Sequence, residues 1–95
     1  MLFHVLTKVQ PPPGADPEEI ERLFNLEHAH AVRLQHQGKW LHLWRVVGQW
    51  ANISIFRVET PDELHEILRS LPLHPYSKTK VTALCRHPGS LADAD

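Results

Sequence analysis

Residues 40 to 56, WLHLWRVVGQWANISIF, decide the fold because they read as two strands that fold back on each other. Aromatic and β-branched residues dominate both halves, and these residue types favour strands. Gly48 lies between the halves, where glycine is typical of a tight turn. We therefore expect strands over 39–47 and 50–58, joined by a two-residue turn with Gly48 at its first central position.

The register of this hairpin gathers polar side chains on one face. Counting back from the turn, Arg45 lies opposite Asn52 and Leu43 lies opposite Ser54, so Arg45, Asn52 and Ser54 share a face. Strict alternation gives this face three further apolar residues, which are Leu41, Trp50 and Phe56. Polar groups gathered among apolar neighbours favour a cavity that binds a ligand.

Helix signals stand on both sides of the hairpin. Asp16 is a good N-cap, Pro17 suits the first helical position, and Gly38 suits the end, so a helix is predicted from about 17 to 37. The same start pattern at Thr60 predicts a second helix that runs to about residue 70.

Strand-like segments complete the order at both ends. LFHVLTKV at 2–9 and TKVTALCR at 79–86 are rich in β-formers, and the latter follows a proline-punctuated connection. A polar tail occupies 87–95. The order β-α-β-β-α-β predicts one α+β domain over 1–95, a ferredoxin-like fold with two helices on one face of a four-stranded antiparallel sheet.

Both faces of the predicted strand 39–47 are largely apolar, which is unusual for a sheet with one wetted side. We expect the second face to pack against another copy of the chain. The protein is therefore expected to be an oligomer, which also suits a chain of only 95 residues.

The first predicted helix carries a carboxylate inside its apolar stripe. At about 100° per residue, Glu27 falls among apolar side chains that share its face. These are Ile20, Leu23, Phe24, Ala31 and Leu34. A carboxylate there needs a partner, or its pKa rises. Glu27 alone could reach solvent at the rim, and Arg45 alone could form a structural ion pair, but their convergence with Asn52 and Ser54 favours a site.

Composition excludes several classes of function. A net charge of −1 gives no basic surface for nucleic acid, and no segment is long and apolar enough for a membrane helix. The single Cys85 precludes an internal disulfide, and the N-terminus lacks a signal-peptide pattern, so we expect a cytoplasmic protein. Although the chain has eight histidines, none has metal-ligand spacing, and no metal site is expected.

Several motifs together resemble the muconolactone Δ-isomerase family. They are MLFHV, HLWR, AN-S-F with one residue between each, LPLHPY and CRHP, and the resemblance covers nearly the whole chain. It implies a ferredoxin-like fold, sheets paired into an oligomeric α+β barrel, a homodecamer and no cofactor. The implied reaction of aromatic-compound breakdown, in the β-ketoadipate pathway, converts muconolactone to 3-oxoadipate enol-lactone.

The implied chemistry suggests a role for each candidate residue. A sheltered carboxylate can carry a proton between two ring carbons, and donors can stabilise the enolate that forms. We hypothesise that Glu27 is the proton shuttle and that Asn52 and Ser54 are the donors. Arg45 is the expected clamp for the substrate carboxylate, and three other cationic or titratable residues are weaker candidates. These are Lys39, His42 and His4.

One departure from the family pattern keeps alternatives open. The family commonly has tyrosine just before AN, where this chain has Trp50, which we expect to touch the substrate. The change could favour a chlorinated or methylated lactone, as in a chloromuconolactone dehalogenase or a methyl-muconolactone isomerase. A non-catalytic oligomeric module that binds a small acid would keep Arg45 but would not need Glu27.

Overall fold

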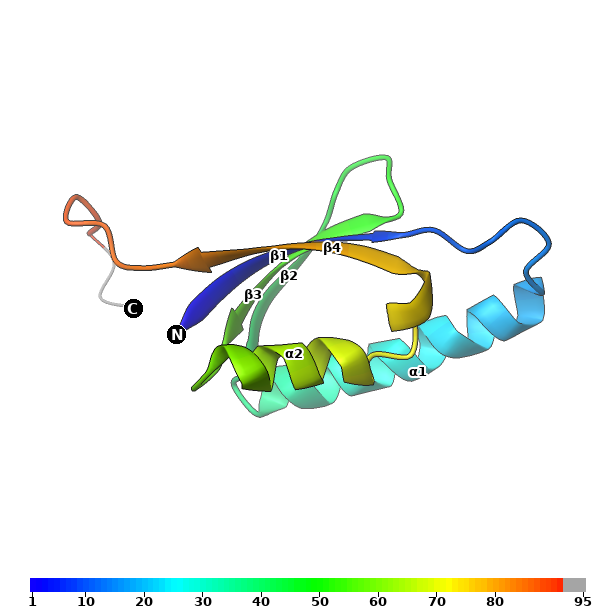
Figure 1. The fold of residues 1–95 in the computed structure, drawn as a ribbon, viewed down its shortest axis with the longest axis horizontal. Helices are drawn as coiled ribbons and strands as arrows, with labels where there is room; N and C mark the ends of the chain where they lie inside the picture. The colour runs from blue at the N-terminus through cyan, green and yellow to red at the C-terminus, as the bar shows by residue number, and fades with distance from the viewer. Residues whose placement is uncertain (92–95) are drawn as a thin grey trace.

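The computed structural model describes residues 1–91, so the last four residues of the predicted tail lie outside it. In chain order the elements are β1 (Leu2–Val9), α1 (Pro17–His36), β2 (Trp40–Arg45), β3 (Ala51–Arg57), α2 (Pro61–Ser70), the 3-10 helix η1 (His74–Tyr76) and β4 (Ser77–Leu84). The strands form one antiparallel sheet in the order β2-β3-β1-β4. Both helices cover the same face (Figure 1), which confirms the predicted ferredoxin-like α+β fold.

The helix ends form as their capping residues predict. At the start of α1, Asp16 accepts a hydrogen bond from the Glu18 N–H at 3.0 Å. At its end, Gly38 adopts φ 74° and donates to the Gln35 carbonyl, while the next N–H donates to the carbonyl of Leu34. This pair of bonds is a Schellman motif, which needs a residue with positive φ at the glycine position.

The predicted register of the hairpin is confirmed. Arg45 pairs with Asn52, and Leu43 pairs with Ser54. Asn52 and Ser54 in turn pair with Thr7 and Val5 of β1, in the middle of the sheet. The polar residues of the hairpin therefore face α1 and α2.

The predicted turn is wrong in its length and in the position of its glycine. Val46 donates its N–H to Ala51, and Gln49 donates to the carbonyl of Val46, so the turn runs from Val46 to Gln49. Gly48, at φ 77°, is the third residue of this turn. A positive φ there is the requirement of a type II turn. Val46 and Ala51 are thus the last bonded pair, and four residues, 47–50, connect them, not two.

The predicted alternation along β2 is also wrong at its start. The register shifts between Trp40 and His42, as in a β-bulge, which places an extra residue in one strand. As a result Trp40, and not Leu41, packs beneath the helices, with its ring centroid 4.7 Å from that of Phe56. On the opposite, uncovered face, His42 stacks on Trp44, which is 64% exposed.

The core lies between the sheet and the helices. Its buried cluster comprises Phe3, Val5, Ala31, Leu34, Trp40, Phe56, Val58, Leu64, Ile67 and Leu68. β4 begins two residues before the predicted strand, directly after η1, because Ser77 pairs with Val9. None of the helices within residues 1–91 is long and apolar enough to cross a membrane.

Candidate active site

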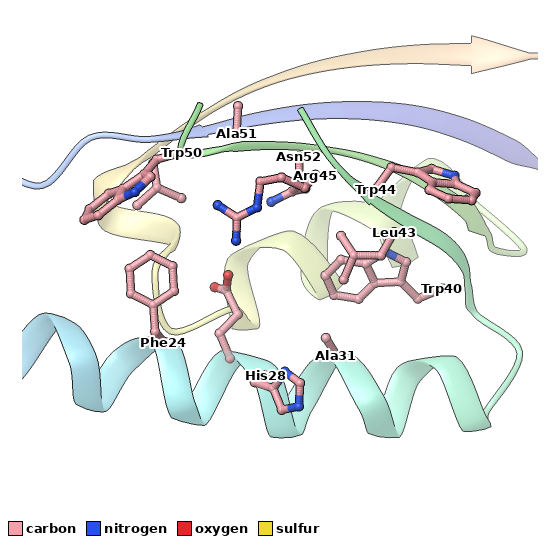
Figure 2. A pocket seen from close by; sticks show the side chains of 12 residues that line it. Phe24, His28, Ala31, Trp40, Leu43, Trp44, Arg45, Trp50, Ala51 and Asn52 are labelled. Atoms are coloured by element: carbon pink, nitrogen blue, oxygen red, sulfur yellow. The ribbon is translucent and has the colours of Figure 1, made fainter. Parts of the chain in front are cut away.

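A cavity of about 280 Å³ lies between α1 and the hairpin. Figure 2 shows its side chains, which come from α1, β2, β3, the end of β1 and the 47–50 connection. The lining residues are Val9, Phe24, Glu27, His28, Ala31, Trp40, Leu43, Trp44, Arg45, Trp50, Ala51 and Asn52. The walls are mainly apolar, with a few polar groups, as in sites for small molecules.

Glu27 is the half-buried acid of this cavity. Its Oε1 accepts a hydrogen bond from the Leu73 backbone N–H at 3.0 Å. Burial raises the pKa of Glu27 above its usual value, and the bond from Leu73 opposes this rise only in part. Among the described residues the ion pairs are Arg22–Glu19 and Lys39–Glu63, so Glu27 has no cation paired with it.

The Leu73 N–H is the functional group that sequence analysis missed. Residues 71–76 read LPLHPY, and Pro72 and Pro75 have no N–H to donate. The N–H groups of residues 71, 74 and 76 each donate to the backbone carbonyl three residues earlier, at 2.9 to 3.3 Å. Leu73 alone in this segment directs its N–H to a side chain. A proline-rich turn therefore presents one backbone donor to Glu27.

Arg45 and Asn52 stand on the hairpin side of the cavity. The Arg45 guanidinium extends into the cavity from β2 (Figure 2), and its Nη1 lies 3.4 Å from the carbonyl oxygen of Gln49. Asn52 accepts a hydrogen bond on Oδ1 from the Ser54 hydroxyl at 3.3 Å. Because the oxygen of the amide is engaged, the NH2 group of Asn52 is the end that can donate to a ligand.

Ser54 is 1% exposed and lies at a second, smaller cavity of about 20 Å³, not at the larger one. This smaller cavity also includes Glu27 and Asn52, and it is large enough for about one water molecule. Ser54 therefore affects the larger cavity indirectly, through the hydrogen bond that orients Asn52.

Two tryptophans shape the ends of the larger cavity. Trp50 is 60% exposed, and its ring meets Phe24 edge-on with centroids 5.8 Å apart. Trp40 belongs to the core and forms an apolar wall of the cavity. Its Nε1 is fully buried and has no hydrogen-bond partner among the described residues. An unpaired buried donor of this kind costs about 1–3 kcal/mol.

The remaining candidate residues lie outside both cavities. Lys39 pairs with Glu63 at 3.0 Å, at the start of α2. His4 pairs with Ile55 and Thr82 within the sheet, and His42 stacks on Trp44. Within residues 1–91, no three His, Cys, Asp or Glu side chains gather as metal ligands would.

The arrangement can bind an anion and move a proton. A carboxylate with a raised pKa is, once ionised, a stronger base than a solvated one, and an unpaired guanidinium nearby can hold a carboxylate. The free amide donor of Asn52 can stabilise a developing oxyanion. These are the requirements for abstracting and returning a proton next to a carbonyl group.

Comparisons with known proteins agree with this chemistry. The sequence model of the family described as "Muconolactone delta-isomerase" matches residues 1–90. A muconolactone Δ-isomerase of Acinetobacter baylyi is 48% identical over 100% of this chain and 99% of its own length. Muconolactone Δ-isomerase 2 of Acinetobacter lwoffii is 50% identical with the same coverage.

A solved structure extends the likeness to three dimensions. A crystal structure of muconolactone isomerase superposes with a TM-score of 0.94 and 45% identity, covering 100% of this chain and 99% of that one. The match in fold and sequence therefore spans all of the described residues. The chain therefore belongs to the muconolactone Δ-isomerase family.

Proposed function

We propose that the protein isomerises muconolactone to 3-oxoadipate enol-lactone, with Glu27 as the single proton shuttle. The observation that carries this mechanism is the half-buried carboxylate of Glu27, which lines a cavity, has no paired cation among the residues that the structure describes, and has a raised pKa. Burial of this kind makes the ionised carboxylate a stronger base, which suits it to proton abstraction.

The geometry supports different tasks for the two oxygens of Glu27. Because Oε1 accepts the Leu73 N–H, Oε2 is the oxygen available to the substrate. It removes the proton at C4 of the lactone ring, and the electrons of that bond delocalise through a dienolate onto the carbonyl oxygen. The same oxygen returns the proton at C2, so the double bond moves and Glu27 is regenerated.

The hairpin supplies the groups that hold the reacting ring. The Asn52 NH2 group donates to the enolate oxygen, and Ser54 fixes the amide orientation by donating to its Oδ1. Arg45 binds the carboxymethyl group of the substrate, because its charge is free of any carboxylate in the cavity. Trp50 and Phe24 enclose the apolar side of the ring. Membership of the family favours this isomerase over a dehalogenase.

The test is turnover of muconolactone by Glu27→Gln beside the wild-type protein. Loss of a general base lowers kcat by roughly 10²- to 10⁴-fold. Glutamine keeps an oxygen for the Leu73 N–H, so the fold and ligand binding are expected to persist. In heavy water, proton NMR of the wild-type reaction follows exchange at C2.

Glu63→Gln is the matched control, because Glu63 also accepts a backbone N–H but lies away from both cavities. Its turnover is expected to equal that of the wild type. Normal turnover by Glu27→Gln would exclude Glu27 as the shuttle. If the wild-type protein showed no turnover and Glu27→Gln bound the lactone with unchanged affinity, the results would favour a non-catalytic binding module.

We also propose that the protein works in the cytoplasm as a homodecamer built from dimers. The uncovered face of the sheet supports this assembly, because it carries Trp44, Ile53 and Ile55 together with Leu2 and Leu6. An exposed apolar face of this kind is typical of a subunit interface. Light scattering at micromolar concentration is expected to give ten times the mass of the chain, and a monomer would contradict the proposal.

A further inference from the structure

A chain of hydrogen bonds outside both cavities joins α1 to the end of α2. Arg33 Nη2 lies 2.6 Å from His30 Nδ1, and His30 Nε2 lies 2.9 Å from the Ser70 hydroxyl oxygen. Ser70 donates its own proton to the carbonyl of Ile67 at 2.6 Å. These bonds therefore link His30 and Arg33, in the C-terminal half of α1, to Ser70, the last residue of α2.

The chemistry of these groups fixes the direction of every bond. A guanidinium has no acceptor, so His30 Nδ1 must accept from Arg33. The ring proton of neutral His30 is then on Nε2 and is donated to Ser70. Burial, together with the charge of Arg33, lowers the pKa of His30 and so favours this neutral form.

These hydrogen bonds lie close to the Glu27–Leu73 bond at both of its ends. His30 follows Glu27 by three residues on α1, so the two side chains are neighbours on the helix surface. Ser70 precedes Leu73 by three residues, with the rigid Pro72 between them. The His30–Ser70 and Glu27–Leu73 bonds are thus adjacent links between α1 and the segment that leaves α2.

The two sides of Leu73 are held by different contacts. Its carbonyl accepts from the Tyr76 N–H at 2.9 Å and from the Ser77 hydroxyl at 2.7 Å, which fixes the following peptide group. Its N–H belongs to the preceding peptide group, the one between Pro72 and Leu73. The direction of that N–H therefore depends on how residues 70–72 leave α2, and Ser70, the last residue of α2, contacts His30.

We propose that His30 and Ser70 are positioning residues, which hold the end of α2 so that the Leu73 N–H stays bonded to Glu27. The inference rests on the proposed role of Glu27 for its effect on catalysis, but the positioning itself does not need the reaction. The titratable groups that share a cavity with Glu27 are Arg45, His28 and His74, and none of them takes part in the link.

The experiment compares variants that break the link with variants that restore it. Ser70→Ala and His30→Ala remove the contact. Ser70→Thr keeps a hydroxyl, and His30→Gln keeps a side-chain N–H that can reach Ser70. In the substrate-free protein, hydrogen exchange of the Leu73 amide and the NMR titration of the Glu27 carboxyl carbon are measured in each variant.

We expect the broken variants to exchange the Leu73 amide roughly two- to tenfold faster, which corresponds to the loss of about one hydrogen bond. Because the Leu73 bond lowers the pKa of Glu27, its loss moves the Glu27 titration to higher pH. The acidic limb of the kcat/KM profile moves in the same direction. Ser70→Thr and His30→Gln are expected to return all three readouts toward the wild type.

Glu63→Gln is again the control, because it loosens the other end of α2 and leaves the Ser70 contact intact. It is expected to change none of the three readouts. Unaltered exchange and titration in both Ala variants would overturn the positioning role. A moved Glu27 titration with an unmoved pH–rate limb would support the positioning role and overturn Glu27 as the shuttle.

Discussion

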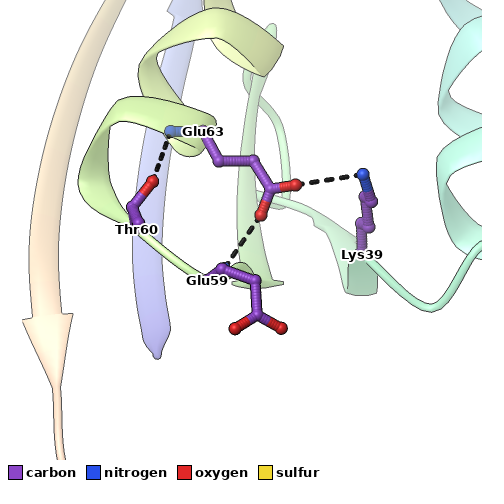
Figure 3. Close-up of polar contacts among 4 residues, drawn as sticks. All are labelled: Lys39, Glu59, Thr60 and Glu63. Carbon is purple, nitrogen blue, oxygen red and sulfur yellow. Dashed lines mark hydrogen bonds and ion pairs between the residues drawn. The ribbon is translucent and has the colours of Figure 1, made fainter.

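Glu27 and Glu63 each accept a hydrogen bond from a backbone N–H, but their surroundings differ. Glu63 accepts from the Glu59 N–H at 2.8 Å and also pairs with Lys39 at 3.0 Å (Figure 3). Glu27 accepts from the Leu73 N–H, lies half-buried, and has no paired cation among residues 1–91. The hydrogen bonds from Glu59 and Lys39 lower the pKa of Glu63, whereas burial raises the pKa of Glu27.

This difference is the basis of our proposal that Glu63 is a structural carboxylate and Glu27 a reactive one. A backbone donor orients both groups, so orientation alone does not decide the role. What differs is whether a cation is committed to the carboxylate before any ligand arrives. In the Glu27 region the nearby cation, Arg45, shares the cavity without pairing with the acid, and it remains available for a ligand.

The largest expected effect in the Glu27 region, apart from that of Glu27 itself, comes from Asn52. Asn52→Ala removes the donor proposed for the enolate, and loss of one such donor lowers kcat by roughly 10²- to 10³-fold. Steady-state kinetics with muconolactone measure the change. Ser54→Ala keeps the donor and frees only its orientation, so its kcat is expected to lie between those of Asn52→Ala and the wild type. A normal kcat in Asn52→Ala would assign the oxyanion to another group.

Arg45→Gln is expected to act mainly on binding. Hydrogen bonds to charged groups contribute about 1.5–3 kcal/mol, so KM is expected to rise roughly 10- to 150-fold while kcat changes less. Arg22→Gln is the matched control, because Arg22 forms an exposed ion pair with Glu19 outside both cavities. If Arg45→Gln lowered kcat with KM unchanged, the guanidinium would act in the transition state and not as a clamp.

Local rules were enough to predict most of the fold. The capping residues of both helices determine their starts, and the polar positions of the hairpin determine its register. The turn was predicted wrongly because one glycine can supply positive φ at either central position, and only the tertiary structure selects between them. The bulge at Leu41 likewise could not be predicted, because both faces of β2 are apolar and a shift of one residue does not change that pattern.

The candidate site was predictable only where it is made of side chains. Glu27, Arg45 and Asn52 stood out as polar groups in apolar patterns, and all of them line the larger cavity. The Leu73 donor had no such signature, since a backbone N–H is common to every residue except proline. The pairing of Lys39 with Glu63 joins residues 24 apart, and it depends on how α2 packs beside β2.

The smallest expected effects are in stability, and they have opposite signs at the two carboxylates. The raised pKa of Glu27 means that the folded state holds this proton more tightly than the unfolded state. Stability from this group is therefore lost as pH rises from about 4.5 through the folded pKa. Glutamine carries no charge, so Glu27→Gln is expected to become more stable relative to the wild type over that rise.

Glu63 is expected to show the reverse dependence. Its lowered pKa contributes stability above pH 4.5, and this contribution is lost as pH falls through the folded pKa. Glu63→Gln should therefore be less stable than the wild type at neutral pH and approach it in acid. Urea unfolding of the three proteins from pH 8 down to below the folded pKa of Glu63 measures both differences. High salt should shrink the Glu63 difference, because that ion pair is partly exposed, and should affect Glu27 less. Differences of the same sign would mean that the two carboxylates are not distinguished by burial and pairing.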